Sequence, residues 1–407
     1  MLNVRKKPVF DDSLIKLEYR AHEPFATARY NPSDEIVFPF SQPGEYVNIS
    51  RSYLQVEGTL TKYDRYTLAP NGIAYAFDDI KLLMNGELVD KTSYPGVAST
   101  MKGYASFSKA STNSLHQAGW IVPSKTSTLN PCIDENSGNF SACIPLRTLL
   151  GFAEDYQEIL VNVRLELVMN RAATDTNVII PRLPVATGTA TTGSPDFTIK
   201  KMVWYIPYVG PADKERADLL ELLEENEPIT MGFRSWTLSI YPTLPTNKEF
   251  SWTVKTSTEL EKPRYVIFGM KTDLQKNVDK NMALFHHCEL TNFRLYVGSQ
   301  VFPYSRLNLD FDTKRVPILY HMYTEFQRAY YSEEWSQPML TYKEFIDLAP
   351  IVVIDCSHQL DSSMGNSVLD IRIDFETKQP VPANTTAYCL MLQDSLVTYS
   401  PLTRVVQ

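Results

Sequence analysis

The sequence predicts an all-β protein made of two tandem eight-stranded jelly rolls, a double jelly roll with a few short decorating helices. Three observations support this prediction: a set of segments that occurs twice, short strand-like runs bounded by turn residues, and 23 Tyr, 19 Phe and 26 Pro among 407 residues. Aromatic side chains suit the pleated surface of a sheet, and proline interrupts it. A jelly roll accommodates about eight strands with one long hairpin better than an up-and-down barrel does.

The repeat consists of three segments that recur in the same order. Residues 79–89 and 292–302 both have the pattern strand, tight turn, strand. A segment on each side of this hairpin also has a counterpart. The matched pairs, with the spacing between them, are Gly58 and Gly269 (211 residues), Gly86 and Gly298 (212 residues), and Arg164 and Arg372 (208 residues). The nearly constant spacing indicates two copies of one domain.

Composition places the chain among ordinary globular proteins, with 43% hydrophobic and 21% charged residues. A length of 407 residues allows two domains with complete cores. The net charge of −8 argues against a surface that attracts nucleic acid as a whole. We expect no signal peptide and no membrane-spanning segment. Five cysteines without regular spacing predict a reduced compartment, so the N-x-S/T triplets at Asn48, Asn139 and Asn384 are interpreted as chance.

The predicted domain order is an N-terminal arm at 1–24, a first jelly roll at 25–195 and a second at 196–407. The arm is charged and weakly periodic, with too little apolar surface to order within its own domain. We therefore expect it to order only against a neighbouring molecule or another surface. The stretch 171–194 is rich in Thr, Ala, Gly and Pro and is interpreted as the linker that closes the first copy.

Local signals predict the connections within each copy. Asn85-Gly86 between apolar runs predicts a two-residue hairpin turn, because both positions need a positive φ. Residues 211–225 predict a helix that opens at a proline and lies outside the sandwich. Apolar residues at helical spacing after Pro95 and after Pro317 predict one amphipathic helix in each copy.

A search for catalytic motifs finds one formal match. Nucleotide-binding glycine loops, H-E-x-x-H and G-x-S-x-G are all absent from the sequence. Ser99 and Lys102 fit S-x-x-K, but no K-T-G partner exists and Met101 belongs to the apolar stripe of the predicted helix. We interpret the match as a solvated helix face.

The densest group of metal-ligand residues is His286-His287-Cys288. If the segment is a strand, its neighbouring side chains point to opposite faces, so the two histidines cannot reach one ion. Residues 355–358, Asp-Cys-Ser-His, could converge on it across strands, but an ordinary strand entry is the preferred interpretation. No H-x-H exists, which argues against a cupin enzyme. We expect no metal and no cofactor.

Paired carboxylates are the last candidates for chemistry, as they could serve glycoside hydrolysis across a cleft. The pairs are Asp78-Asp79, Glu154-Asp155 and Asp310 with Asp312. With 47 acidic residues such pairs arise easily, so we interpret these pairs as solvated surface.

The basic residues Arg5-Lys6-Lys7 could make a weak contact with nucleic acid. We expect no catalytic, cofactor-binding or metal-binding residues and no enzymatic activity.

Taken in order, the segments of this chain resemble the double jelly-roll major capsid proteins of Polinton/Maverick-like elements and adintovirus-like DNA viruses. The resemblance covers about residues 30–405. The segments that carry it are 41–46, 53–58, 77–80, 85–87, 149–156, 159–169, 233–236, 252–256, 262–265, 308–311 and 384–389.

The resemblance implies the adenovirus-hexon and tailless-phage capsid lineage, which has no catalytic residues to carry over. It implies a homotrimer in which three chains present six sandwiches with pseudo-six-fold symmetry, surrounded by neighbouring capsomers. A separate penton protein would fill the five-fold vertices. The arm would order against a neighbouring capsomer or the inner shell surface, and its basic residues could make a weak contact with the DNA genome. The implied location is the virion, with synthesis in the host cytoplasm or nucleus and no secretion.

Three alternatives remain open at this point. A tandem β-sandwich carbohydrate-binding protein would need an exposed aromatic platform or a calcium loop. A secreted jelly-roll enzyme, such as a copper monooxygenase or an amidase, would need a signal peptide and disulfides. A domesticated host copy of a capsid gene would keep the fold without packaging DNA.

Overall fold

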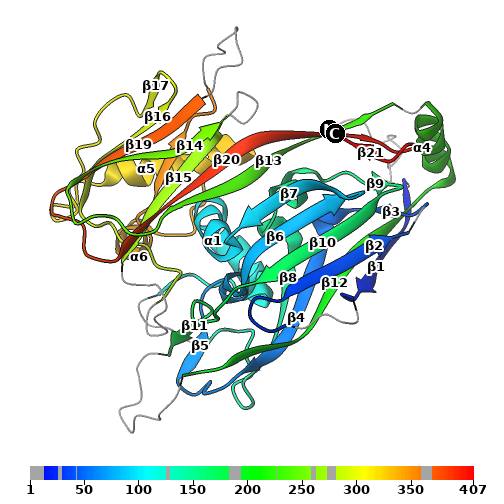
Figure 1. Cartoon of the computed structure of the whole chain (residues 1–407), viewed down its shortest axis with the longest axis horizontal. Helices are drawn as coiled ribbons and strands as arrows, with labels where there is room; N and C mark the ends of the chain where they lie inside the picture. The colour runs from blue at the N-terminus through cyan, green and yellow to red at the C-terminus, as the bar shows by residue number, and fades with distance from the viewer. Residues whose placement is uncertain are drawn as a thin grey trace, which may run out of the picture.

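The computed structural model describes residues 13–25, 30–42, 44–124, 129–182, 194–225, 227–257, 263–272, 281–358 and 369–407. Within them the chain forms two β-sandwiches that lie side by side, with helices between and around them (Figure 1). All strand pairs among these residues are antiparallel, and most of them join strands that are far apart in the sequence.

The first sandwich packs one four-stranded sheet against another. Two short strands, β3 (Tyr46–Val47) and β9 (Leu160–Val161), extend its first sheet. In spatial order the first sheet contains β8 (Asn139–Pro145), β4 (Tyr53–Leu60), β12 (Phe197–Pro211) and β1 (Leu14–His22), and the second contains β2 (Glu35–Ser41), β10 (Arg164–Arg171), β6 (Phe77–Met84) and β7 (Glu87–Ser93).

The second sandwich repeats this plan. The C-terminal strand β21 (Val405–Val406) pairs with the outer end of its longest strand. One sheet contains β18 (Val352–Asp355), β15 (Pro263–Thr272), β20 (Thr385–Ser400) and β13 (Ile229–Tyr241), and the other contains β14 (Glu249–Ser257), β19 (Leu369–Thr377), β16 (Leu290–Val297) and β17 (Gln300–Phe302).

The two sandwiches have the same topology. When the eight main strands of each are numbered along the chain, both pair as 1-8-3-6 in one sheet and 2-7-4-5 in the other. Eight strands in this order form a jelly roll. The predicted double jelly roll is therefore confirmed, and so is the placement of Arg164 and Arg372 on equivalent strands, β10 and β19.

Alternating side chains explain why these segments form half-buried strands. In β4 every second residue is buried, beginning with Leu54, and β10 alternates in the same way from Leu165. Since neighbouring side chains of a strand point to opposite faces, this period of two places one set in the sandwich core.

The predicted hairpins are also confirmed. Asn85 and Gly86 have φ values of 52° and 93° and join β6 to β7. Gly298, with φ of 57°, joins β16 to β17 in the equivalent place. The match is shifted by one residue, because Gly86 is the second residue of its turn and Gly298 is the first. Each turn needs positive φ, which glycine adopts without strain.

The predicted arm at 1–24 is wrong for residues 14–22. These residues form β1, which pairs with β12 from Leu14↔Pro211 to His22↔Trp204 and is the first strand of the first roll. Its hydrogen bonds to a strand almost 200 residues away offset the cost of ordering it, a non-local gain that composition does not reveal. Arg5, Lys6 and Lys7 lie outside the described residues.

The boundary between the rolls also lies later in the chain than the predicted residue 195. β12 is the eighth strand of the first roll, and the second roll begins with β13. The helix α4 (Asp213–Glu225) lies between them, so it links the rolls instead of decorating the second, and it starts two residues later than predicted. Leu219 and Leu223 of α4 pack on Tyr46, Val161 and Val209 of the first roll.

The two helices predicted after the hairpins are confirmed as α1 (Pro95–Ser106) and α5 (Pro317–Tyr331), each with proline in its first turn. The other regular elements are short. They are α2 (Lys109–Ser114), α3 (Gly151–Asp155), α6 (Tyr342–Leu348), β5 (Tyr66–Leu68), β11 (Ile179–Pro181), and the 3-10 turns η1 (Ile49–Arg51), η2 (Gly72–Ala76), η3 (His116–Ala118) and η4 (Leu146–Thr148).

The pairing of β1 predicts the effect of two truncations. Deletion of residues 1–22 removes β1, leaves one edge of β12 unpaired and uncovers Tyr208, which is stacked against His22. We expect the melting temperature to fall by several degrees or the protein to become insoluble. Deletion of residues 1–12 is the control, because it keeps β1 whole and should leave melting close to that of the full chain. Equal melting of the two truncated proteins would contradict the structural role of β1.

Candidate functional site

The seam between the two jelly rolls carries the densest set of buried polar contacts, and we treat it as the candidate functional site. Helices α1 and α3 of the first roll meet α5 and strand β13 of the second there (Figure 1). Buried apolar side chains of both rolls belong to one connected cluster. The two rolls therefore share a core instead of touching through a wet surface.

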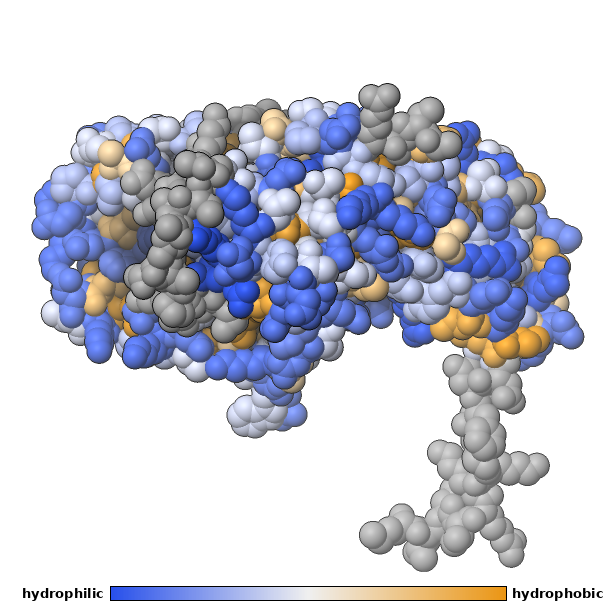
Figure 2. All heavy atoms as spheres, turned by 90° about the horizontal axis from the view of Figure 1, so that it is seen from below, coloured by the Kyte–Doolittle hydropathy of each residue, from blue (hydrophilic) through white to orange (hydrophobic). Residues whose placement is uncertain are grey.

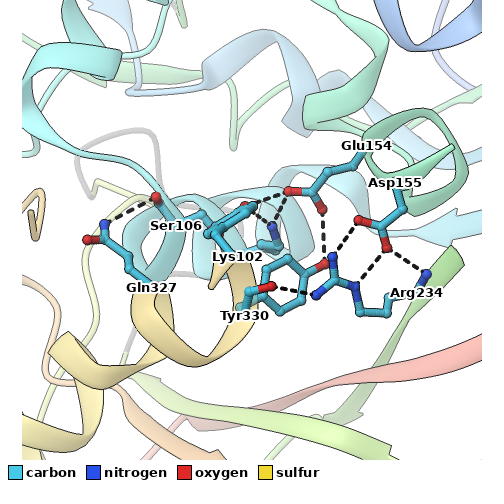
Figure 3. A network of polar contacts seen from close by, with 8 residues as sticks. Lys102, Ser106, Glu154, Asp155, Arg234, Gln327 and Tyr330 are labelled. Carbon is cyan, nitrogen blue, oxygen red and sulfur yellow. Dashed lines mark hydrogen bonds and ion pairs between the residues drawn. The ribbon is translucent and has the colours of Figure 1, made fainter. Parts of the chain in front are cut away.

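The first part of the seam joins α3 to the free edge of β13. Asp155 accepts hydrogen bonds from the backbone N–H of Arg234 at 2.8 Å and from its guanidinium Nε at 2.8 Å and Nη2 at 2.6 Å (Figure 3). A bidentate guanidinium–carboxylate pair fixes orientation as well as distance. Any side chain in place of the Gly151 hydrogen would collide with the Arg234 carbonyl, so glycine permits this close approach.

The second part is the buried ion pair between Lys102 of α1 and Glu154 of α3. Lys102 Nζ also donates to the Tyr331 hydroxyl at 2.6 Å. The hydroxyls of Tyr330 and Tyr331, at the end of α5, both donate to Glu154, and Figure 3 shows the contact of Tyr330. The Lys102 and Glu154 side chains are only 3% and 14% exposed. The pair lies within the first roll, and the tyrosines of the second roll complete its hydrogen bonds.

The ring of Tyr330 connects these two parts. The Arg234 guanidinium lies 3.5 Å from the ring centroid and Lys102 Nζ lies 4.3 Å from it, so two cations contact one aromatic ring. Burial lowers the pKa of Lys102, and Glu154 partly offsets this shift. Burial, followed by the nearby Glu154, raises the pKa of Tyr330 and Tyr331 well above 10, so both hydroxyls remain hydrogen-bond donors at neutral pH.

Two sequence-based interpretations are corrected here. Ser99 and Lys102 do not lie on a solvated helix face, since each is 2% exposed. Ser99 donates to the Pro95 carbonyl and accepts from Asn71, so it is no partner of Lys102. Glu154 and Asp155 are part of the seam and not solvated surface. Nothing in the local sequence distinguishes them, because their partners come from the other half of the chain.

A third set of contacts joins α1 and η2 to the loop before β16. The Tyr104 hydroxyl donates to the Ala283 carbonyl at 2.6 Å, and the Tyr75 hydroxyl donates to the Met282 carbonyl at 3.0 Å. From α5, Tyr323 donates to the Tyr104 carbonyl at 2.9 Å. These three tyrosines form hydrogen bonds from helices of one roll to the backbone of the other. The bonds restrict rotation and sliding of the two rolls against each other.

Lys271 of β15 is buried in the same region, and no carboxylate of the described residues pairs with it. Its Nζ donates to the Met282 carbonyl and lies 4.3 Å from the centroid of Phe285. Burial lowers the pKa of Lys271 to about 7. At neutral pH the folded protein therefore holds this amine close to its titration point.

The chain end makes a fourth contact between the rolls. Tyr399 at the end of β20 donates to the carbonyls of Val161 and Asn162 at 3.0 and 2.9 Å. Arg404 donates to the Asn162 side chain at 2.7 Å. The long strands β13 and β20 thus reach from the second roll across the first (Figure 1).

Residues 286–288, interpreted from the sequence as an ordinary strand entry, do not form a regular strand. His286 makes an isolated bridge to Met270, and Cys288 and Glu289 have φ values of 43° and 53°, so the segment turns. His287 stacks on Phe311 with centroids 4.3 Å apart. Within the described ranges no group of three or more His, Cys, Asp and Glu side chains could hold a metal ion, including residues 355–358.

The other carboxylate pairs lie at the surface with lysine partners. Asp79 pairs with Lys91 at 3.1 Å, and Asp310 and Asp312 both pair with Lys378. Among the described helices none is long and apolar enough to cross a membrane.

Comparison with known families and structures identifies the architecture. The double jelly roll-like domain model matches residues 66–397. The chain belongs to the double jelly roll-like domain family. No curated protein sequence matches it. This description agrees with the two jelly rolls that the strand order shows in this chain.

Solved structures share this fold at low sequence identity. The mavirus major capsid protein is 11% identical with a TM-score of 0.60, over 100% of this chain and 92% of that chain. The Faustovirus major capsid protein is 10% identical with a TM-score of 0.61, over 97% and 92%. The Sputnik virophage structure is 12% identical with a TM-score of 0.56, over 100% and 91%. The matches span more than nine tenths of both chains in each case, so these proteins share the overall fold of this chain.

The buried ion pair gives a stability prediction. Lys102→Met leaves Glu154 buried without its cation, and we expect a loss of about 3–5 kcal/mol in the free energy of unfolding. Urea unfolding measures the loss. The double variant Lys102→Met/Glu154→Gln removes both charges and should recover part of it. Arg164→Ala breaks the exposed pair with Glu166 and is the control, with an expected loss below about 1 kcal/mol. Equal effects of Lys102→Met and Arg164→Ala would contradict the structural role of the buried pair.

Lys271 predicts how stability depends on pH. Its pKa is about 7 in the folded protein, against 10.5 for an ordinary lysine, so between these values the unfolded chain binds a proton that the folded protein lacks. This lysine's contribution to stability therefore rises with pH from 7 to 10.5, by at most about 1.4 kcal/mol per pH unit. We expect Lys271→Met to stabilise the protein most at or below pH 7.

The measurement is the difference in melting temperature between Lys271→Met and the parent protein across this pH range. The difference should shrink as pH rises. The Met282 carbonyl keeps its bond from Tyr75 in the variant. Lys200→Met, at an exposed position of β12, is the control. A pH-independent difference would show that Lys271 titrates normally.

Proposed function

We propose that this protein is a major capsid protein whose trimers present six jelly rolls and tile an icosahedral shell around a DNA genome. The observation that carries the proposal is the presence of two jelly rolls with one topology in one chain, held as one body by a buried seam. Three such chains supply six similar lobes, the number that a six-neighbour lattice position needs. The resemblance of the fold to viral major capsid proteins supports this function.

The seam suits a building block of a shell. A capsomer holds its neighbours in register only if its lobes do not move relative to one another. The bidentate Asp155–Arg234 pair and the tyrosines that donate across the seam restrict such motion, because each has a directional partner. Repeated closed contacts between identical subunits are how symmetric shells form.

The proposal implies partners beyond the trimer. A block with six lobes cannot occupy a five-fold vertex, so a separate penton protein is needed there. Neighbouring capsomers contact the outer sides of each trimer. We also propose that Arg5, Lys6 and Lys7 make a weak contact with the genome. The protein would be made in the host cytoplasm or nucleus, would be located in the virion, and would have no enzymatic activity.

The oligomeric state tests the proposal. We expect a stable trimer of about 139 kDa, three times 46.4 kDa, in light scattering coupled to size exclusion at micromolar concentration. Its intersubunit contacts should bury more than about 2,000 Å². Negative-stain microscopy should show particles with a hexagonal outline. A monodisperse monomer would contradict the capsid function and favour a carbohydrate-binding protein or a domesticated copy.

A further inference from the structure

The segment that leads into β16 contains a strained turn at residues 287–290. The Leu290 N–H donates to the His287 carbonyl at 2.9 Å, and the two residues between them, Cys288 and Glu289, have φ values of 43° and 53°. Positive φ at both central positions is the pattern of a type I′ turn, which strongly prefers Asn-Gly. Left-handed backbone is unfavourable for Cys and Glu, so contacts around the turn must hold it.

The ring of His287 makes two of these contacts. Its Nδ1 accepts a hydrogen bond from the Glu289 N–H at 2.9 Å, and the ring stacks on Phe311 with an interplanar angle of 10°. The neighbouring His286 is held in a similar way, since its Nδ1 accepts from the Thr272 N–H at 3.2 Å. An imidazole nitrogen that accepts a hydrogen bond carries no proton, so this arrangement of the turn requires a neutral His287.

Protonation of His287 would remove its contact with the turn, because an Nδ1–H would then face the Glu289 N–H. Burial lowers the pKa of His287, and the nearby carboxylates of Glu289, Asp312 and Asp347 partly offset this shift. The nearby cation is Lys378, whose ammonium pairs with Asp312. The ring is therefore neutral at neutral pH, and an imidazolium formed in acid has carboxylates toward which it can turn.

The turn also forms one wall of a cavity of about 530 Å³ in the second roll. Residues 286–289 line one side, and Phe285, Ile346 and Pro382 contribute apolar surface to the others. Phe285 is only 1% exposed. The face of the molecule in Figure 2 is mostly hydrophilic, with its apolar side chains in separate patches. Release of the turn would add to the surface apolar groups that the folded protein keeps from water.

We propose that His287 is an acid-sensitive switch, whose protonation releases the strained turn at 287–290 and opens the adjoining cavity. The released segment binds a proton at the ordinary histidine pKa of 6.5, whereas the closed turn binds it only at lower pH. The closed turn therefore loses stability as pH falls below 6.5 and is unaffected above it. All the groups involved lie in one chain, so this inference goes beyond the proposed capsid function and does not depend on it.

Labelling of Cys288 measures the release, because its thiol lies within the turn. The rate with N-ethylmaleimide is followed from about pH 7.5 to about pH 5, a range that spans histidine titration. Dividing it by the rate for the same tryptic peptide in the urea-unfolded chain removes the effect of thiol ionisation. We expect this normalised rate to rise below pH 6.5, by about tenfold for each unit by which the closed turn lowers the His287 pKa.

Two variants test the parts of the switch. His287→Asn keeps a side-chain acceptor for the Glu289 N–H but does not titrate, so its normalised rate should be independent of pH. Glu289→Gly relieves the strain of positive φ and should slow the labelling of Cys288 at every pH. His321→Asn is the matched control on α5, where the side chain is 71% exposed, and it should keep the acid response of the parent protein.

A second thiol separates local release from unfolding of the whole roll. Cys389 of β20 is fully buried in the same roll, and we expect it to stay unlabelled over this pH range. A normalised Cys288 rate that does not change with pH would overturn the inference. An acid response that persists in His287→Asn, or labelling of Cys389 in parallel with Cys288, would also overturn it. A wild-type monomer would contradict the capsid proposal but leave this measurement unchanged.

Discussion

The carboxylate of Asp155 joins the two jelly rolls at the edge of β13, where it is the most directional contact of a seam that also includes a shared apolar core. It accepts hydrogen bonds from a guanidinium and from a backbone N–H on the free edge of β13. Sheet edges otherwise expose unpaired backbone groups that invite association with other strands. Here the edge is capped by a side chain from the other roll, so one contact both protects the edge and fixes the rolls. Tyr330 adds the second cation of the seam, Lys102, to the same network.

The two copies of the domain share one strand order, but helices cover their surfaces differently. The second roll has its outer sheet face covered by α5 and by helices of the first roll, whereas in the first roll Leu219 and Leu223 of α4 pack on Val209 at one end of the equivalent face and Leu17 and Tyr19 stay exposed. The two copies of the domain therefore differ in which of their surfaces are covered. This difference arises from where helices pack and not from a difference in strand order.

The limits of sequence reasoning are clearest at the ends of the first roll. Hairpins and amphipathic helices depend on neighbours within a few residues, so Asn85-Gly86 and the stretches after Pro95 and Pro317 were predictable. β1 and β12 depend on pairing with each other across the whole first roll, and their assignment to an arm and to the second roll was wrong. The seam was missed for the same reason, since Glu154 and Asp155 resemble solvated acids until Arg234 and Tyr331 are placed beside them.

The sequence by itself determined the strand periodicity, the turns, the helices after each hairpin and the duplication, because each is a local pattern or a spacing. Its resemblance to capsid proteins pointed to the family that the domain match confirms. Only the tertiary structure decided where the first roll starts and ends, which acids are buried, and which helices cover the outer sheet faces. Those features come from contacts between residues far apart in the chain, whose energies depend on burial and geometry that no local pattern contains.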